Sequence, residues 1–137
     1  MRLIFALVWL IASVSAVASP CDGVDHSLPD ERKAVLAPIV SKQLASKIDI
    51  HSVEVMRSFH FKDWFILYID PKTADEVFLF YNGDPINHLY LLAWPDAFSE
   101  NDERQVIRTL LRGKTIGIPR PLAACFAWYV TKGTTQR

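Results

Sequence analysis

Cysteine is scarce in this sequence, with only Cys21 and Cys125 among 137 residues. Two cysteines so far apart cannot build a disulfide-dense scaffold, and they lack the close CxxC spacing of structural zinc sites. The two residues remain available for one purpose, a bridge to each other, provided that the chain is exported to an oxidising compartment.

An excess of charge of one sign is also missing. The sequence holds 15 Lys and Arg residues against 15 Asp and Glu residues. Because positive charge is not in excess, the chain lacks the electrostatic attraction that binds nucleic acid or an anionic membrane surface. We therefore expect neither nucleic acid as a partner nor insertion of the mature chain into a membrane.

Motifs of known catalysts and cofactor sites are absent as well. The sequence has no GxSxG nucleophile motif, no glycine-rich phosphate loop and no dinucleotide fingerprint. Paired carboxylates at Asp63 and Asp84 remain conceivable, but aspartate is common in turns for local hydrogen-bonding reasons. We predict no enzyme activity and no cofactor.

Histidine does not supply a metal site in the expected fold. There is no HxH or HxxxH spacing, and two of the histidines, His60 and His88, are expected on strands about 14 Å apart at roughly 4.8 Å per strand spacing. His51 falls at the opposite end of the first of these strands, and His26 precedes the first helix. Ligands of one zinc ion must each lie about 2.1 Å from it, so we predict no bound metal.

Residues 1–18 have the three parts of a secretory signal peptide. Arg2 is followed by an apolar run, Leu3 to Ala12, and by small residues that end at Ala18. The run is too short for a membrane anchor, which needs about 20 apolar residues. Pro20 before Cys21 argues against a lipoprotein site. We expect cleavage near Ala18 and a single domain over residues 19–137, located in the periplasm or secreted.

The expected export predicts a disulfide between Cys21 and Cys125. Both residues stay in the mature chain, and an even pair in an oxidising compartment predicts a bridge. It would tie the N-terminal arm to the C-terminal part of the fold. In the chain-entropy model a closed loop of about 100 residues contributes about 4–5 kcal/mol.

Two segments have a helical pattern. The first starts with the N-cap candidate Ser27 and repeats apolar residues from Leu36 to Ile48, with Pro38 inside, so we expect a kinked helix or two short helices. The second opens at Ser99, with Asp102 three positions later, and stops at Gly113.

Between these helices the periodicity is that of strands. Alternation begins at Ser52 and continues to Phe61, and three further apolar segments follow. They are Trp64–Ile69, Glu76–Tyr81 and Ile86–Trp94, and after the second helix Cys125–Thr131 is dense in aromatic and β-branched residues. Asn82-Gly83 indicates a tight hairpin. We predict an α+β fold with a four-strand antiparallel meander and a short C-terminal strand.

The strands carry aromatic residues on both faces. Either helices cover the second face of the sheet, or some rings form an exposed recognition surface. Because two apolar helical stripes must also be buried, we expect coverage.

One end of the meander is the candidate protein-binding site. The first and third turns should project from the same end of the sheet and place a polar rim beside two aromatic rings. The candidate residues are Phe61, Lys62, Asp63, Tyr81, Asn82 and Asp84. The alternative is that these are ordinary turns whose residues serve turn geometry alone.

In size, address and layout the chain resembles the periplasmic inhibitor and immunity proteins of bacteria. The resemblance rests on a small exported α+β domain pinned by one disulfide, and it carries no individual residue across. It implies a domain that binds another envelope protein, such as an envelope-acting enzyme. A structural or accessory envelope role is the alternative, ahead of a small-molecule binder or a hydrolase.

Overall fold

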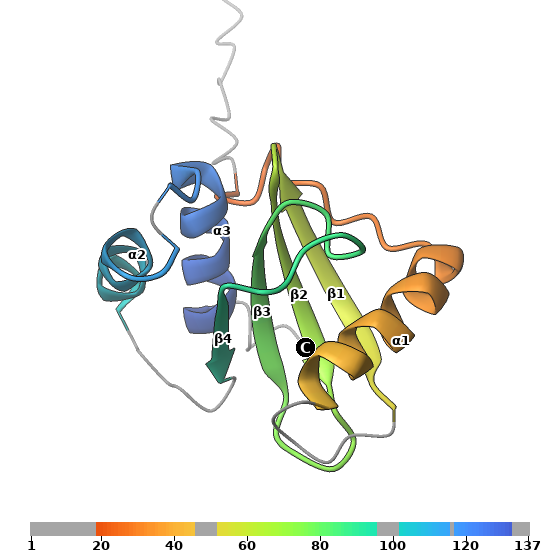
Figure 1. Cartoon of the computed structure of the whole chain (residues 1–137). Coiled ribbons are helices and arrows are strands. Elements are labelled where there is room, and N and C mark those ends of the chain that lie inside the picture. Colours follow the sequence, from red (N-terminus) through yellow and green to blue (C-terminus); the bar gives the residue numbers. More distant parts are fainter. Residues whose placement is uncertain (1–18, 46–51, 96–101, 116, 133–137) are drawn as a thin grey trace, which may run out of the picture.

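The computed structural model describes residues 19–45, 52–95, 102–115 and 117–132 and has an α+β architecture. A sheet lies between helices on its two faces (Figure 1). The predicted fold class is thereby confirmed, with differences at four places. The elements are α1 (Asp30–Ala45), β1 (Glu54–Phe61), β2 (Trp64–Asp70), β3 (Val77–Asn82), β4 (Leu92–Pro95), α2 (Glu103–Arg112) and α3 (Arg120–Thr131).

The sheet is the predicted antiparallel meander in the order β1-β2-β3-β4. Its two central strands are buried almost throughout, which is why their sequences are apolar on both faces. The outer strands differ from each other. β1 pairs with β2 along its length, apart from a register shift between Val55 and Arg57, whereas β4 spans only four residues.

The fourth strand is shorter than predicted, because residues 83–91 form a loop rather than a tight turn and half a strand. Asn82 still pairs with Trp64 at the end of β3. Gly83 adopts a φ of 117°, and a Cβ there would lie 2.4 Å from the His88 ring. The glycine therefore allows the loop to fold back on itself instead of closing a two-residue hairpin.

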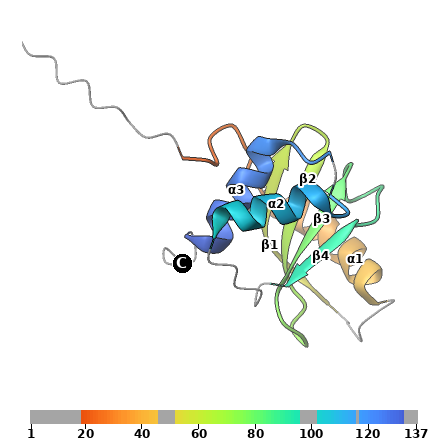
Figure 2. The same ribbon diagram turned by 90° about the vertical axis from the view of Figure 1, so that its left-hand side faces the viewer.

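Each face of the sheet has its own hydrophobic core, so the expected coverage by helices is confirmed. On one face α1 buries Leu36, Val40 and Leu44 against the strands. On the other face α3 packs Phe126 against aromatic residues of β3 and β4, and α2 crosses α3 on its outer side (Figure 2).

The predicted C-terminal strand is wrong: Cys125–Thr131 belongs to α3. Two signals for a helix precede it, the prolines at 119 and 121, which suit the first turn of a helix. The buried positions Leu122, Phe126 and Tyr129 then recur at helical spacing. Aromatic and β-branched content was misleading because a helix between a sheet and a second helix buries such side chains equally well.

The two other helices also differ in detail from the prediction. α1 starts at Asp30, beyond Ser27, and continues through Pro38 as one 16-residue helix rather than two. α2 is capped by Asp102, whose side chain accepts a hydrogen bond from the Arg104 N–H, and it ends at Gly113 as predicted. Ser99, Ile48 and the proposed signal peptide lie outside the described residues.

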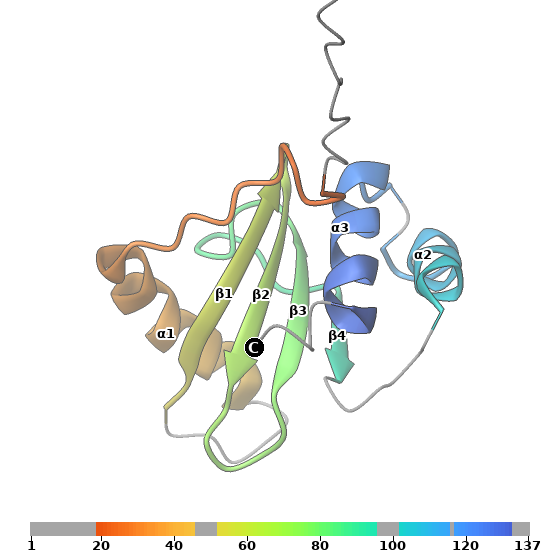
Figure 3. The ribbon, with the colours of Figure 1, turned by 180° about the vertical axis from the view of Figure 1, so that it is seen from behind.

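The predicted disulfide between Cys21 and Cys125 is present, with a Cα–Cα distance of 4.5 Å and a sequence separation of 104. It ties the N-terminal arm, residues 19–29, to a buried position of α3 and not to a strand edge. From this anchor the arm runs across one end of the sheet to α1 (Figure 3). On the way Asp25 and His60 of β1 exchange two backbone hydrogen bonds of 2.8 Å.

Candidate functional site

The first and third turns do lie at the same end of the sheet. The Gly83 N–H donates a 2.7 Å hydrogen bond to the carbonyl oxygen of Asp63. Lys62 has a φ of 53° in the first turn, a left-handed conformation that a tight turn requires. Lys62, Asp63 and Asn82 are exposed, so this part of the predicted rim exists.

The two aromatic residues of the predicted site are not on the surface in the way expected. Tyr81 is fully buried in the core under α1, where its hydroxyl donates a 2.7 Å hydrogen bond to Gln43 Oε1. Burial raises the pKa of this hydroxyl well above its ordinary value. Phe61 is half-buried against the α3-side core, and the Lys62 ammonium lies 5.7 Å from its ring centroid. Tyr81 is therefore removed from the candidate surface.

Asp84 also has partners within the fold. Its carboxylate accepts hydrogen bonds of 2.9 Å from Arg32 of α1 and from the Ile86 N–H. Partial burial opposes ionisation, but these two donors outweigh it and hold the pKa of Asp84 below its usual range. The pair fastens the start of the loop to α1. Whether Asp63, Lys62 and Asn82 contact a partner stays a prediction.

The loop 83–91 lies against α1 and turns aliphatic side chains outward. Gln43 of α1 donates hydrogen bonds from Nε2 to the carbonyl oxygens of Pro85 (3.4 Å) and His88 (3.0 Å). The outward side chains, which we call the loop patch, belong to Ile86, Leu89 and Leu91, and they are 40%, 74% and 43% exposed. Three of the five large hydrophobic side chains that are exposed among the described residues are therefore on this loop.

Hollows flank β4 on both sides. One, of about 520 Å³, lies between β4, the end of α1 and the β2–β3 connection; the other, of about 260 Å³, lies between β4 and the end of α2. Both are lined by Leu92, Ala93, Pro95 and Lys114. Among the strands that the structure describes, β4 has a neighbour on one side only, β3. We call this strand, with its two hollows, the β4 edge.

Sequence reasoning missed the β4 edge because it treated Ile86–Trp94 as one continuous strand. One signal in this segment argues against a regular strand: four apolar residues follow one another, at positions 89–92. A half-buried strand alternates between apolar and polar residues, and a run without alternation in a strand next to solvent must leave some apolar side chains exposed.

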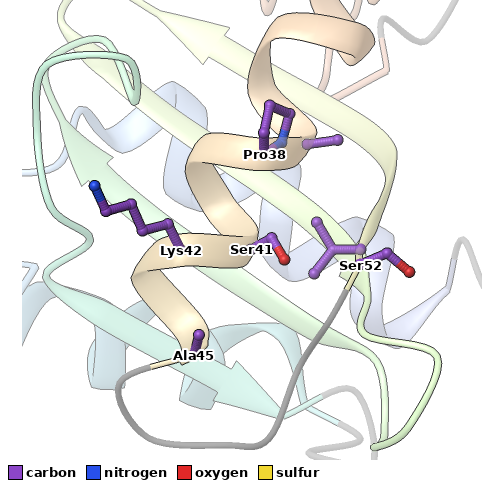
Figure 4. A pocket seen from close by; sticks show the side chains of 7 residues that line it. Pro38, Ser41, Lys42, Ala45 and Ser52 are labelled. Carbon is purple, nitrogen blue, oxygen red and sulfur yellow. The ribbon is translucent and has the colours of Figure 1, made fainter.

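A third hollow, of about 490 Å³, lies between α1 and the start of β1. Figure 4 shows Pro38, Ser41 and Ala45 on the helix opposite Ser52, with Lys42 extending away from Ser52. Ligand sites usually bring several polar groups together in an apolar cavity. The two serine hydroxyls do not amount to such a set, and we assign no role to this hollow.

One group of residues has the spacing of metal ligands. The ligand atoms of Cys21, His26 and Cys125 lie within 4.8 Å of one another. The two sulfur atoms are bonded to each other in the disulfide, and zinc requires thiolates. In the oxidised protein the group therefore does not offer the ligands that a metal needs.

None of the helices within the described ranges has both the length and the apolar character needed to cross a membrane. Comparisons of the chain with protein-family models, with curated proteins and with solved structures found no match. The interpretation of the site therefore rests on its own geometry.

Proposed function

We propose that this chain is an exported protein-binding domain whose interface is the β4 edge together with the loop patch. One observation carries the proposal: a sheet edge flanked by two hollows adjoins three exposed aliphatic side chains. Export is supported by the signal-like pattern of residues 1–18 and by the disulfide, which suits an oxidising compartment.

The geometry suits a partner that presents an extended segment. An edge strand can accept a further strand through main-chain hydrogen bonds, while pockets beside the edge receive alternate side chains of the added segment. The hollows on the two sides of β4 are placed for such alternate side chains, and the lining residues Leu92, Ala93 and Pro95 favour aliphatic ones.

Charge adds a second element of recognition. The larger hollow is lined by Asp75 and Glu76 as well as by Lys114. Lys114 is the only charged residue that lines the smaller hollow, and it forms no ion pair within the part of the chain that the structure describes. A carboxylate on the partner would pair with it. We therefore propose that the partner is an envelope protein with an extended segment that combines aliphatic side chains with an acidic residue.

Within this class we favour an inhibitor or immunity role against an envelope-acting enzyme. Leu89 is the most exposed large hydrophobic side chain among the described residues, and Gln43 of α1 holds its loop through the His88 carbonyl oxygen, so this side chain is available as an apolar contact for a partner. An accessory role within a larger envelope assembly would use the same surface, so the identity and size of the captured partner separate the two.

The proposal is tested by affinity capture from the exported fraction of the source cells with matched surface variants. Leu89→Lys and Leu91→Lys place charges in the loop patch, and Lys114→Glu reverses the charge at the β4 edge. Val35→Lys is the control, because Val35 is 47% exposed on α1 and Leu91 is 43% exposed. Asp63→Lys tests the turn end predicted from the sequence.

We expect one partner, identified by mass spectrometry, whose recovery falls at least tenfold with Leu89→Lys and Lys114→Glu and stays unchanged with Val35→Lys. Equal recovery with every variant would exclude the β4 edge. Loss with Asp63→Lys alone would instead place the interface at the turn end. If the wild-type protein captures no specific partner, the protein-binding role itself is contradicted.

A further inference from the structure

A histidine lies beside the disulfide. The ligand atoms of Cys21, His26 and Cys125 lie within 4.8 Å of one another. In a tetrahedral zinc site the bonds to sulfur and nitrogen are about 2.0–2.3 Å long, so two ligand atoms of the same ion are roughly 3.3–3.8 Å apart. Once the two sulfur atoms are no longer bonded to each other, small rotations of the side chains therefore suffice for the three groups to share one ion.

The position of His26 is fixed by contacts that do not involve the disulfide. Val24 is buried in the core on the α3 side of the sheet. Asp25 exchanges two backbone hydrogen bonds with His60 of β1. The His26 ring packs edge-on against Phe59 of β1, with ring centroids 5.1 Å apart. The histidine is thus held near the cysteines by the arm and by β1, and these contacts are available in the reduced protein too.

The three groups differ in their access to solvent. Cys125 is fully buried in α3, Cys21 is half-buried in the arm, and His26 is exposed. An ion bound among them would lie at the surface side of Cys125, where it can enter from solution. Thiolate sulfur and imidazole nitrogen are ligands that zinc prefers, and three protein ligands leave the fourth position to water or another small ligand.

We propose that the reduced form of this protein binds one Zn²⁺ ion through the sulfur atoms of Cys21 and Cys125 and a ring nitrogen of His26. The ion fastens the N-terminal arm to α3, as the disulfide does in the oxidised form. The two states exclude each other, because the same sulfur atoms cannot be joined to each other and serve as thiolate ligands. The site therefore exchanges a covalent link for a metal link at the same place in the fold.

The exchange needs a reductant of the dithiol class. By thiol–disulfide exchange the S–S bond of the protein breaks, two S–H bonds form, and the dithiol is oxidised to its own disulfide. Zn²⁺ then forms bonds to both sulfur atoms, and the two thiol protons are released to the solvent, whereas His26 binds as the neutral imidazole. A newly exported chain, whose cysteines are not yet joined, reaches the same metal-bound state without a reductant.

The test compares zinc binding by the reduced and the oxidised protein. The bridge is opened with a dithiol, which is then removed under nitrogen so that it does not compete for the metal. Zinc is titrated by calorimetry, and Co²⁺ serves as a spectroscopic probe, because thiolate coordination gives it a charge-transfer band in the near ultraviolet. The variant is His26→Ala, with His88→Ala as the matched control, since both histidines are exposed. Urea unfolding of the reduced protein with and without zinc shows whether the folded state binds the ion.

We expect one Zn²⁺ per reduced chain and none bound by the oxidised protein. The affinity should fall at least tenfold with His26→Ala, since even the loss of an outer partner of a metal ligand costs about that much, and should not change with His88→Ala. Zinc should raise the urea midpoint of the reduced wild type, because the ion binds the folded chain more tightly than the unfolded one.

Equal affinities of wild type and His26→Ala would overturn the three-ligand site. Zinc binding by the oxidised protein, or a reduced protein that binds no zinc or gives no charge-transfer band with Co²⁺, would overturn the proposal as well. A urea midpoint that zinc leaves unchanged or lowers would show that the thiols bind the ion only in the unfolded chain, which likewise contradicts a site built by the fold.

Discussion

The two edges of the sheet are treated differently. At the β1 edge, the N-terminal arm pairs with His60 through two backbone hydrogen bonds, and the disulfide fixes the start of that arm to α3. At the β4 edge, no segment within the described ranges pairs with the strand, and two hollows lie beside it. An open edge invites pairing with other chains, so proteins usually cover it. Among the described residues, the disulfide thus helps to hold a segment at one edge, whereas the other edge ends in a short strand beside two hollows.

The largest expected effect comes from releasing the β1 edge. Reduction of the disulfide, or the double variant Cys21→Ala with Cys125→Ala, should lower the free energy of unfolding by about 2–5 kcal/mol. Without the bridge the unfolded chain is no longer closed into a loop, so its conformational entropy is higher. Urea unfolding of the oxidised and reduced proteins measures the difference. Equal midpoints and slopes would mean that the arm is held without the bridge.

A matched pair of glycines compares the arm with the loop beside β4. Gly23 and Gly83 both have positive φ, at 83° and 117°, but an added Cβ meets no atom within 4 Å at Gly23 and meets the His88 ring at Gly83. Gly23→Ala should cost about 1 kcal/mol from backbone strain, and Gly83→Ala about 2–3 kcal/mol.

The His88 ring can rotate away, so the double variant Gly83→Ala with His88→Ala separates steric contact from backbone strain. We expect it to recover the part of the loss due to the ring, measured by thermal unfolding. If Gly23→Ala and Gly83→Ala lower the stability by the same amount, the contact between the His88 ring and position 83 does not matter for the loop.

A smaller effect is expected where the loop is fastened to α1. Asp84→Asn removes the charge that pairs with Arg32, and since the two side chains are 40% and 28% exposed, the loss at pH 7 should be about 0.5–1 kcal/mol. The pKa of Asp84 is lowered in the folded state, so its contribution is complete above the unfolded-state pKa of about 3.9 and disappears as the pH falls through the folded-state value.

The corresponding measurement is the difference in unfolding free energy between wild type and Asp84→Asn from pH 7 down to pH 2. The difference in unfolding free energy between wild type and Arg32→Gln should likewise become smaller as the pH falls. A difference that stays constant across this range would contradict this account, because the hydrogen bond from the Ile86 N–H can be kept by the amide oxygen and only the pairing of the carboxylate charge depends on pH.

The parts of the fold that sequence patterns predict are those with a clear local pattern. α2 has apolar residues at helical spacing next to a recognisable cap, and the central strands are uninterrupted apolar runs bounded by turns. The disulfide was predicted from the number of cysteines together with the export expected from the pattern of residues 1–18. Coverage of both faces of the sheet followed from the need to bury two apolar helical stripes.

The parts that were not predicted depend on tertiary contacts. Cys125–Thr131 is helical because α3 is enclosed between the sheet and α2, which gives its aromatic residues buried surroundings without strand pairing. Likewise, residues 86–90 lie outside the sheet, where Gln43 and Arg32 of α1, distant in the sequence, bind the loop. Tyr81 was wrongly included in the predicted binding site for the same reason. The pattern of apolar residues in its strand does not indicate that α1 covers its ring.

Amide hydrogen exchange of the free protein, measured in the oxidised and reduced forms, tests the contrast between the two edges most directly. In the oxidised protein the amides of β4 should exchange faster than those of β1 near His60, and reduction should speed exchange at His60 and Asp25 while leaving β4 nearly unchanged. Slow exchange along β4 would show that this edge is covered in solution, and an equal response of both strands to reduction would show that the disulfide does not act on one edge in particular. Either result would contradict the account.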